Sequence, residues 1–563
     1  MDTSRLISVA AGREAPDLVL KNAVYLDVFT GRFLHGDIAL CGDRIAGVGE
    51  YDGPKSVDCT GKTLVPGFID GHIHLESSVV RPAEFARIVL PQGTAAVVTD
   101  PHEIANVLGR KGVEYMLEAT RDLPLDVYVM IPSCVPATPF DESGAELTHE
   151  DVQALMSSER VLGLAEMMNF VGTVNADPEV LLKIKAAKDA RKFVDGHAPG
   201  LSGHSLNAYA AAGVESDHEC TTVREAEEKL SLGQRIMIRD GTAGRNLAEL
   251  MPLLATSCAA RCMFVTDDKH PGDLMHRGHI NAIVREAIAD GARPETAYTV
   301  ASFGAAEYFD LRDRGAIAPG YLADIVVLDD VETVSIHSVY RRGRLVDDAM
   351  LAECVSHVPA ELEKAATDTV HLDPVRAEDF AVGKAHVIGL VPGELLTTDE
   401  GFADGYDTAR DICKVCVIER HRRTGHKGIC WIRGYGIQNG AVATSVSHDS
   451  HNIIAAGSSD GDIAAAVNAL IDMHGGVVVV SEGKIQGSLP MPIAGLISDR
   501  DAVSAQAAMD DMKRQAWALG VSKDIDPIMT LSFVSLPVIP HLKLTTLGVV
   551  DVDAFRLADG NLR

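Results

Sequence analysis

Eight apolar, strand-like runs between residues 66 and 314 constrain the fold of this chain more than any other feature. Stretches of helical character separate the runs, and a polar residue ends or follows nearly every one. The residues at these ends are His74, Asp100, Pro132, Glu166, His197, His218, Asp240 and Asp267. Eight strand–helix repeats over about 250 residues match the count and length of a (β/α)8 barrel. We therefore predict an α/β protein built round a TIM-like barrel, whose site lies at the carboxyl ends of the strands.

A doubly wound open sheet would give similar local patterns and is the alternative to the barrel. The barrel is favoured because a closed ring of strands can gather ligands from strands that are not neighbours.

Shorter strand-like segments flank the predicted barrel. Alternating apolar and polar residues with turn signals fill 17–48 and return at 320–328 and 339–346. We therefore predict a small composite β-sandwich domain from 1–65 plus 315–390, the barrel at 66–314 and a C-terminal α+β domain at 391–563. A helical run over 463–474 lies within this last domain.

Charge and hydropathy limit the classes of partner that this chain can bind. The chain has 51 Lys+Arg against 80 Asp+Glu, a net charge of −29. Such a surface repels phosphate backbones and anionic lipid, so we expect no nucleic acid and no membrane partner, and a neutral or cationic substrate fits better. Neither a run of about 18 apolar residues nor the apolar core of a signal peptide is found, so we expect a cytoplasmic protein whose cysteines are thiols.

Candidate metal ligands sit at matching places in the barrel pattern. His72 and His74 lie two apart at the end of the first run, so both imidazoles share one face of a strand. Two such histidines alone are often only surface residues. Further imidazoles and carboxylates end four other runs: Glu166, His197, His218 and Asp267. Divalent metals of borderline softness take such ligands, and one carboxylate can bridge two ions.

Several motifs resemble known families. The segment 66–74 looks like the amidohydrolase superfamily, and 315–324 resembles the return of that fold to its β domain. More specific stretches resemble the adenine deaminase family almost from end to end: residues 75–78, 99–106, 165–170, 195–199, 266–271 and 447–452. One departure is 238–242, where that family more often has Glu and Ser in place of Asp240 and Thr242.

The resemblance implies a reaction and a metal centre. It implies hydrolysis of adenine to hypoxanthine and ammonia by a metal-activated hydroxide, with manganese the first choice and iron or zinc possible. One of two divalent ions would be held by His72, His74 and Asp267 and the other by His197 and His218, with Glu166 bridging them. Related cyclic amidohydrolases commonly use a carbamylated lysine where this chain has Glu166. A homodimer is the default expectation.

The resemblance also suggests roles for further residues. Asp267 would move a proton from the nucleophile to the departing ammonia. Glu76 or Glu103 would protonate N1 of the purine, although either could instead orient a histidine. Residues that would hold the purine, or else orient ligands or satisfy neighbouring loops, are His102, Arg239 and Asp268. His448 and His451 could form a lid, bind another metal or belong to a polar turn.

Two competing functions stay open, a cyclic amidohydrolase and a non-catalytic scaffold with the same fold. The other known deaminase architecture needs Pro-Cys-x-x-Cys around one zinc. Cys413 and Cys416 have that spacing, but Ile412 stands in place of the proline and no second pair completes a structural zinc site.

Overall fold

Parallel strands form along the middle of the chain where the apolar runs predict them. The computed structural model describes residues 2–242 and 244–559. The strands are β6 (Phe68–His74), β7 (Thr94–Thr99), β8 (Asp126–Ile131), β9 (Val161–Met167), β10 (Phe193–Gly196), β11 (Ser216–Asp217), β12 (Arg235–Arg239), β13 (Cys262–Val265) and β14 (Asp267–Asp268).

Two hydrogen-bonded sheets hold these strands in their order along the chain, β10-β9-β8-β7-β6-β14 and β11-β12-β13. β13 leads directly into β14, where Asp267 pairs with Ile73 of β6. Beside β11, the N–H of Glu215 donates to the carbonyl of Val194 in β10 at 2.9 Å. The order lacks the reversal of a doubly wound sheet, so that alternative does not hold. The parallel half-barrel and its helices are consistent with a (β/α)8 barrel.

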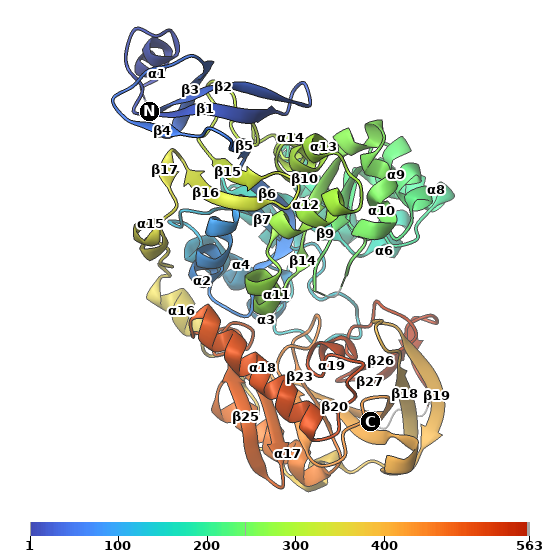
Figure 1. Cartoon of the computed structure of the whole chain (residues 1–563). Coiled ribbons are helices and arrows are strands. Elements are labelled where there is room, and N and C mark those ends of the chain that lie inside the picture. Colours follow the sequence, from blue (N-terminus) through green and yellow to red (C-terminus); the bar gives the residue numbers. More distant parts are fainter. Residues whose placement is uncertain (1, 243, 560–563) are drawn as a thin grey trace.

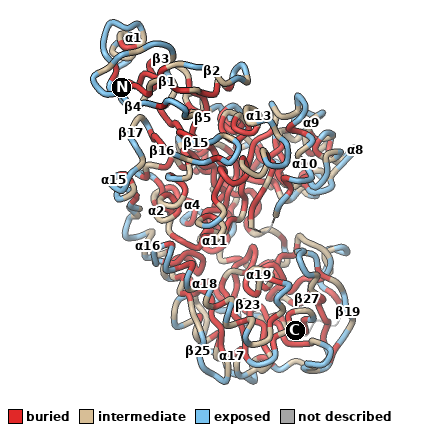
Figure 2. Tube along the Cα trace, viewed as in Figure 1, coloured by how far each residue is buried: buried red, intermediate tan, exposed pale blue. Residues whose placement is uncertain are grey.

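Helices follow the strands along the chain, and most of them cover the outside of this sheet. They are α2 (Pro82–Val89), α3 (His102–Leu108), α4 (Arg110–Ala119), α5 (His149–Leu155), α6 (Phe170–Val174), α7 (Pro178–Asp189), α8 (Gly203–Ala212), α9 (Val223–Ser231), α10 (Leu247–Leu254), α11 (Pro271–His276), α12 (Ile280–Ala289), α13 (Pro294–Thr299) and α14 (Ala305–Tyr308). Local sequence sets their ends: Asp177 caps α7 by accepting from the N–H groups of Glu179 and Val180. Figure 2 shows the strands buried and the outer helices exposed on one side.

The flanking segments join in one sheet of eight strands, ordered β17-β16-β15-β5-β1-β2-β3 with β4 on β1. The strands are β1 (Leu18–Asp27), β2 (Arg32–Cys41), β3 (Arg44–Gly49), β4 (Ser56–Asp58), β5 (Thr63–Pro66), β15 (Ile325–Asp330), β16 (Ser335–Arg341) and β17 (Arg344–Leu345). The sandwich arrangement stays a prediction, because β3 at one edge of this sheet also contacts the segment before β15, where the N–H of Ile45 donates to the carbonyl of Tyr321 at 2.8 Å. Antiparallel pairing of β5 with β15, Val65 opposite Val326, merges both segments into a single sheet.

A second sheet of eight strands forms the C-terminal unit, ordered β19-β18-β21-β20-β23-β22-β24-β25. Its strands are β18 (Ala385–Leu390), β19 (Thr397–Ala403), β20 (Ile412–Ile418), β21 (Lys427–Arg433), β22 (Ala441–Thr444), β23 (Ile453–Gly457), β24 (Gly476–Ser481) and β25 (Lys484–Pro490). The helix expected over 463–474 is α17 (Asp460–Asp472). Further elements are α18 (Ala502–Ala518), α19 (Met529–Phe533) and the hairpin strands β26 (Leu542–Thr545), β27 (Gly548–Asp551) and β28 (Arg556–Leu557).

One sequence expectation changes in this unit. β18 pairs with β19 and β21, so residues 385–390 belong to the C-terminal sheet and not to the composite β unit. Cys413 and Cys416 lie in β20 and contribute to different hydrophobic clusters, because residues three apart in a strand point to opposite faces. They therefore cannot share a zinc ion.

The C-terminal unit lies against the end of the barrel where the strands finish. Figure 1 shows α3, α11 and β14 facing α18 and α19 across the junction, with α15 (Asp348–Ala352) and α16 (Ala360–Ala366) leading from one unit to the other. Asn452 Nδ2 donates to the carbonyl of Glu142 at 3.0 Å, and the N–H of Ala502 donates to Glu84 Oε2 at 3.3 Å. Among the described helices, none is long and apolar enough to cross a bilayer.

Candidate metal centre

Six side chains converge at the carboxyl ends of five strands of the barrel. They are His72 and His74 of β6, Glu166 of β9, His197 directly after β10, His218 directly after β11 and Asp267 of β14. His74 Nε2 lies 3.0 Å from Asp267 Oδ1 and 3.5 Å from Glu166 Oε1. The other oxygen of Glu166, Oε2, lies 2.8 Å from His197 Nδ1 and 3.1 Å from His218 Nε2. Glu166 thus faces both groups of histidines at once.

The donor atoms of this cluster fit divalent cations. His197 Nδ1 and His218 Nε2 are 3.2 Å apart, and the rings of His72 and His218 stack with centroids 4.4 Å apart. Within the described part of the chain, the buried His72 Nε2 has no hydrogen-bond partner. A buried polar atom without a partner is costly, whereas imidazole nitrogens and carboxylate oxygens are ready ligands of borderline divalent metals.

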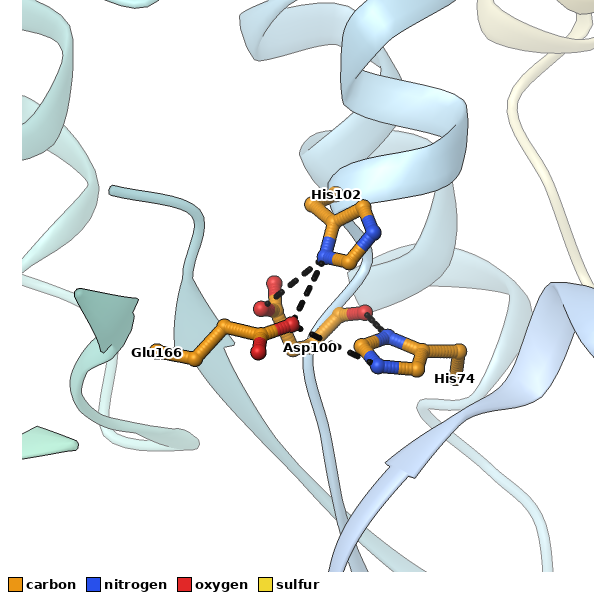
Figure 3. A group of neighbouring side chains, drawn as sticks. All are labelled: His74, Asp100, His102 and Glu166. Atoms are coloured by element: carbon orange, nitrogen blue, oxygen red, sulfur yellow. Dashed lines mark hydrogen bonds and ion pairs between the residues drawn. The ribbon is translucent and has the colours of Figure 1, made fainter. Parts of the chain in front are cut away.

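A fifth imidazole, that of His102, joins the cluster from the first turn of α3 (Figure 3). His102 Nδ1 lies 3.2 Å from both Glu166 Oε1 and Asp100 Oδ2, and Asp100 also accepts a contact from His74 Nδ1 through its carbonyl at 2.9 Å. His102 was predicted to hold the purine or to orient ligands, and its contact with Glu166 brings it within the cluster. Asp100 was not predicted as a site residue. Its position directly after β7 is the signal that could have found it.

Arg239, the last residue of β12, holds the carboxylate of Asp267. Arg239 Nη1 donates to Asp267 Oδ2 at 2.5 Å and also contacts Glu219 Oε1. Burial alone would raise the pKa of Asp267, but the guanidinium of Arg239 and nearby imidazoles hold that pKa well below its ordinary value. Asp267 has φ of 56°, a left-handed backbone that non-glycine residues adopt rarely and that is concentrated at functional sites. Glu219, which sequence reasoning missed, follows His218.

Two buried networks fix the backbone beside the histidines. Lys229 of α9 is fully buried, and its Nζ lies 2.8 Å from the Ala198 carbonyl, 3.1 Å from Asp217 Oδ2 and 2.8 Å from Glu225 Oε1. Asp217 in turn accepts from the N–H of Ala198 at 2.9 Å. The residues next to His197 and His218 are therefore held by one ion pair.

The second network centres on Asp70 in β6. Asp70 Oδ1 accepts from the N–H groups of His72 and Thr266, each at 3.2 Å, and Oδ2 lies 2.9 Å from His279 Nε2. Asp70 thus ties the strand that carries His72 to the strand that carries Asp267. Such supporting contacts orient the donor atoms of a metal site.

A cavity of about 420 Å³ opens beside the cluster at the junction with the C-terminal unit. Its polar side is formed mainly by barrel residues, including the predicted His102, Arg239 and Asp268, with His448 and Asp449 added from the C-terminal unit. Its apolar side comes from the C-terminal unit and is made by Leu395, Leu396, Phe533, Leu536, Val538, Ile539 and Pro540. Pockets of this volume with an apolar wall and a few convergent polar groups suit small organic ligands.

The three remaining acidic candidates lie at the rim of the cluster. Glu103 lines the 420 Å³ cavity, and its Oε1 lies 3.4 Å from His102 Nε2. Glu76 Oε1 accepts from the N–H of Ile104 at 3.1 Å, and burial together with Glu103 raises the pKa of Glu76 to about 7. Glu76 lines a smaller neighbouring cavity instead. Asp268 Oδ1 accepts from Ser77 Oγ at 2.5 Å and borders both cavities.

The fold and the site together define a metal-dependent hydrolase of the amidohydrolase class. A family model described as "Amidohydrolase family" matches residues 63–346, and a model described as "Adenine deaminase C-terminal domain" matches residues 394–556.

Full-length relatives identify the family more closely. The chain is 46% identical to "Adenine deaminase 2" of Carboxydothermus hydrogenoformans, with 99% of each chain covered. It is 47% identical to "Adenine deaminase" of Nitratidesulfovibrio vulgaris, covering 98% of this chain and 97% of the relative. It is 43% identical to "Adenine deaminase 1" of Rhizobium meliloti, covering 98% and 99%. The chain belongs to the adenine deaminase family.

Proposed function

We propose that the chain hydrolyses adenine to hypoxanthine and ammonia. The observation that carries the proposal is the convergence of four imidazoles and two carboxylates beside a cavity with one polar and one apolar side. A purine base presents an apolar face and a polar edge, which match those two sides. The names of the full-length relatives support adenine as the substrate.

Two divalent ions, manganese first and iron or zinc as alternatives, would occupy the cluster. His72, His74 and Asp267 would hold one, His197 and His218 the other, and Glu166 would contact both. When bound, such a pair lowers the pKa of water from 15.7 toward about 7 and so supplies a strong nucleophile at neutral pH.

The proton transfers are assigned to residues of the chain. The water oxygen attacks C6, the C6–N6 bond breaks, and Asp267 carries the proton of the nucleophile to the leaving amine. Arg239 keeps the Asp267 carboxylate anionic and ready to accept that proton. Glu76 or Glu103 donates the proton to N1. Comparing Glu76→Gln with Glu103→Gln distinguishes them, since replacing the true donor abolishes turnover while the six-residue cluster keeps its metal.

The remaining parts of the proposal concern architecture and assembly. We propose a closed (β/α)8 barrel over about 66–314, a composite β unit from 1–65 plus 315–384 and a C-terminal unit from 385 onward. We also propose a cytoplasmic homodimer with adenine and water as its small-molecule partners. Light scattering after size-exclusion chromatography tests the dimer.

The test of the reaction is ammonia release across free purine bases by the manganese-reconstituted chain. We expect release from adenine, loss in His72→Ala and Asp267→Ala with the fold intact, and full activity in the matched control His204→Ala, an exposed residue of α8. Full activity without His72 would refute the proposal. Ring opening of hydantoins without ammonia would instead indicate the cyclic amidohydrolase, and less than one bound ion per chain would indicate a scaffold.

A further inference from the structure

A second cluster of metal-type donors lies outside the six residues of the paired centre. Glu103 comes from α3 of the barrel, while His448 and His451 come from the loop before β23 in the C-terminal unit. One donor atom from each lies within 4.8 Å of the others, and His448 Nδ1 is 3.0 Å from Glu103 Oε1. His451 Nε2 contacts Glu103 Oε2. The three side chains are 2%, 7% and 0% exposed.

Two of these donor atoms have only each other. Glu103 Oε2 and His451 Nε2 are buried and in contact, and among the described residues neither has a hydrogen-bond partner beyond that contact. The cluster also lines a cavity of about 40 Å³, together with Glu76 and Asp268. A space of this size holds an ion or a few waters, because about 10–15 Å³ suffices for one water. Buried polar atoms that face such a space require a partner.

The loop that carries the two histidines is firmly held in place. The fully buried Arg420 contacts the His451 carbonyl and donates to the carbonyls of Ala494 at 2.7 Å and Thr369 at 3.0 Å. His421 Nε2 lies 2.8 Å from the Ser450 carbonyl. The two imidazoles are therefore positioned by the fold of the C-terminal unit, as the donors of a built site must be.

We propose that Glu103, His448 and His451 form an additional site for a divalent transition-metal ion that joins the C-terminal unit to the barrel. Two imidazoles and one carboxylate are a donor set that zinc, iron and manganese accept, with remaining positions open to water. The site adjoins the paired centre through His102, whose Nε2 lies 3.4 Å from Glu103 Oε1 and whose Nδ1 lies 3.2 Å from Glu166.

The ion would act by positioning and not in the reaction itself. The His448 ring stacks on Phe533, with centroids 4.4 Å apart and planes at 20°, and Phe533 belongs to the apolar wall of the 420 Å³ cavity. Asp449, between the two histidines in sequence, lines the same cavity. Fixing His448 therefore fixes the wall against which the substrate packs. This positioning role, unlike the binding of the ion, rests on the proposed function.

The experiment counts metal ions bound per chain after apoprotein is reconstituted with manganese or cobalt and dialysed. We expect His451→Asn and His448→Asn each to bind one equivalent fewer than the wild-type chain. His72→Asn should keep that equivalent while losing metal from the paired centre. The matched control His426→Asn changes an exposed histidine at the same junction, paired with Glu142 at 2.8 Å, and should keep the full count.

The outcomes separate this inference from the proposed function. Equal metal counts in the wild-type chain and in both folded loop variants would overturn the additional site. Should a loop variant fail to fold, cobalt titration of the wild-type chain decides. An equivalent whose absorption bands persist in His72→Asn supports the site, and the absence of such an equivalent overturns it. If the proposed paired centre is wrong, His72→Asn should bind as many metal ions per chain as the wild-type chain does. The positioning role predicts a KM for adenine raised at least fivefold in His451→Asn with kcat less affected.

Discussion

Lys229→Met tests whether a buried ion pair distant from the reacting atoms supports the metal centre. Lys229 and Asp217 are both fully buried, and Lys229 Nζ also contacts the backbone beside His197. Removing one partner of a buried pair costs about 3–5 kcal/mol because the other charge is left unpaired. A unit of 150–250 residues shifts its thermal midpoint by roughly 2–4 °C per kcal/mol, so we expect a decrease of about 6–20 °C. Loosening the residues after β10 and β11 should also weaken metal binding by about 10- to 100-fold.

Thermal unfolding and metal titration measure the two effects. The control Lys185→Met removes an exposed pair with Asp189 and should change neither quantity measurably. Asp217→Asn added to Lys229→Met removes the stranded charge while keeping one acceptor, so part of the lost stability should return. The reasoning would be refuted if Lys229→Met had the same thermal midpoint as the wild-type chain and bound metal with the same affinity.

Further predictions concern charge, geometry and the apolar wall. Burial raises the pKa of Asp141 to about 8, so the folded chain retains a proton that the unfolded chain loses near pH 4. The stability of the wild-type chain should therefore decrease from about pH 4 to about pH 8, relative to that of Asp141→Asn. Thermal midpoints at pH 5 and pH 8.5 measure the change, and an equal change in both chains would contradict the prediction. In Arg239→Lys, the ammonium group cannot contact both Asp267 and Glu219 as the guanidinium does, so kcat should fall about 100-fold while the metal is retained. An unchanged rate in the ammonia assay would exclude this role for Arg239. Leu536→Ala should raise the KM for adenine about 5- to 20-fold with kcat nearly unchanged, whereas a loss confined to kcat would exclude a packing role.

Local periodicity accounts for what the sequence predicted of the barrel. β6 ends at His74, where the first apolar run was predicted to end, and its alternation places His72 and His74 together because every second residue of a strand points to the same face. Glu166, His197, His218 and Asp267 were expected at strand ends, and the fold brings them into one cluster. Their metal-binding roles stay predictions. The positions could be inferred because the carboxyl ends of neighbouring parallel strands meet at one edge.

Features that depend on distant or atypical contacts could not be inferred in this way. Lys229 lies in a polar helix, where a lysine is normally solvated, and only the packing of α9 buries it against Asp217. The composite β unit was predicted from matching patterns on both sides of the barrel, but the pairing that joins its halves, β5 with β15, depends on contact across the whole barrel sequence. The contact of Glu103 with His448 joins residues more than 300 positions apart, and no local pattern signals such a pairing.

The division of the site between two units explains why barrel motifs alone do not settle the substrate. Every residue proposed for the paired metal centre comes from the barrel, whereas the apolar wall formed by Phe533, Leu536 and their neighbours comes from the C-terminal unit. The chemistry of C–N hydrolysis therefore belongs to one unit, and the shape that fits a flat base belongs to the other. Since Glu103, His448 and His451 connect the two, loss of their contacts should impair substrate recognition before it impairs turnover.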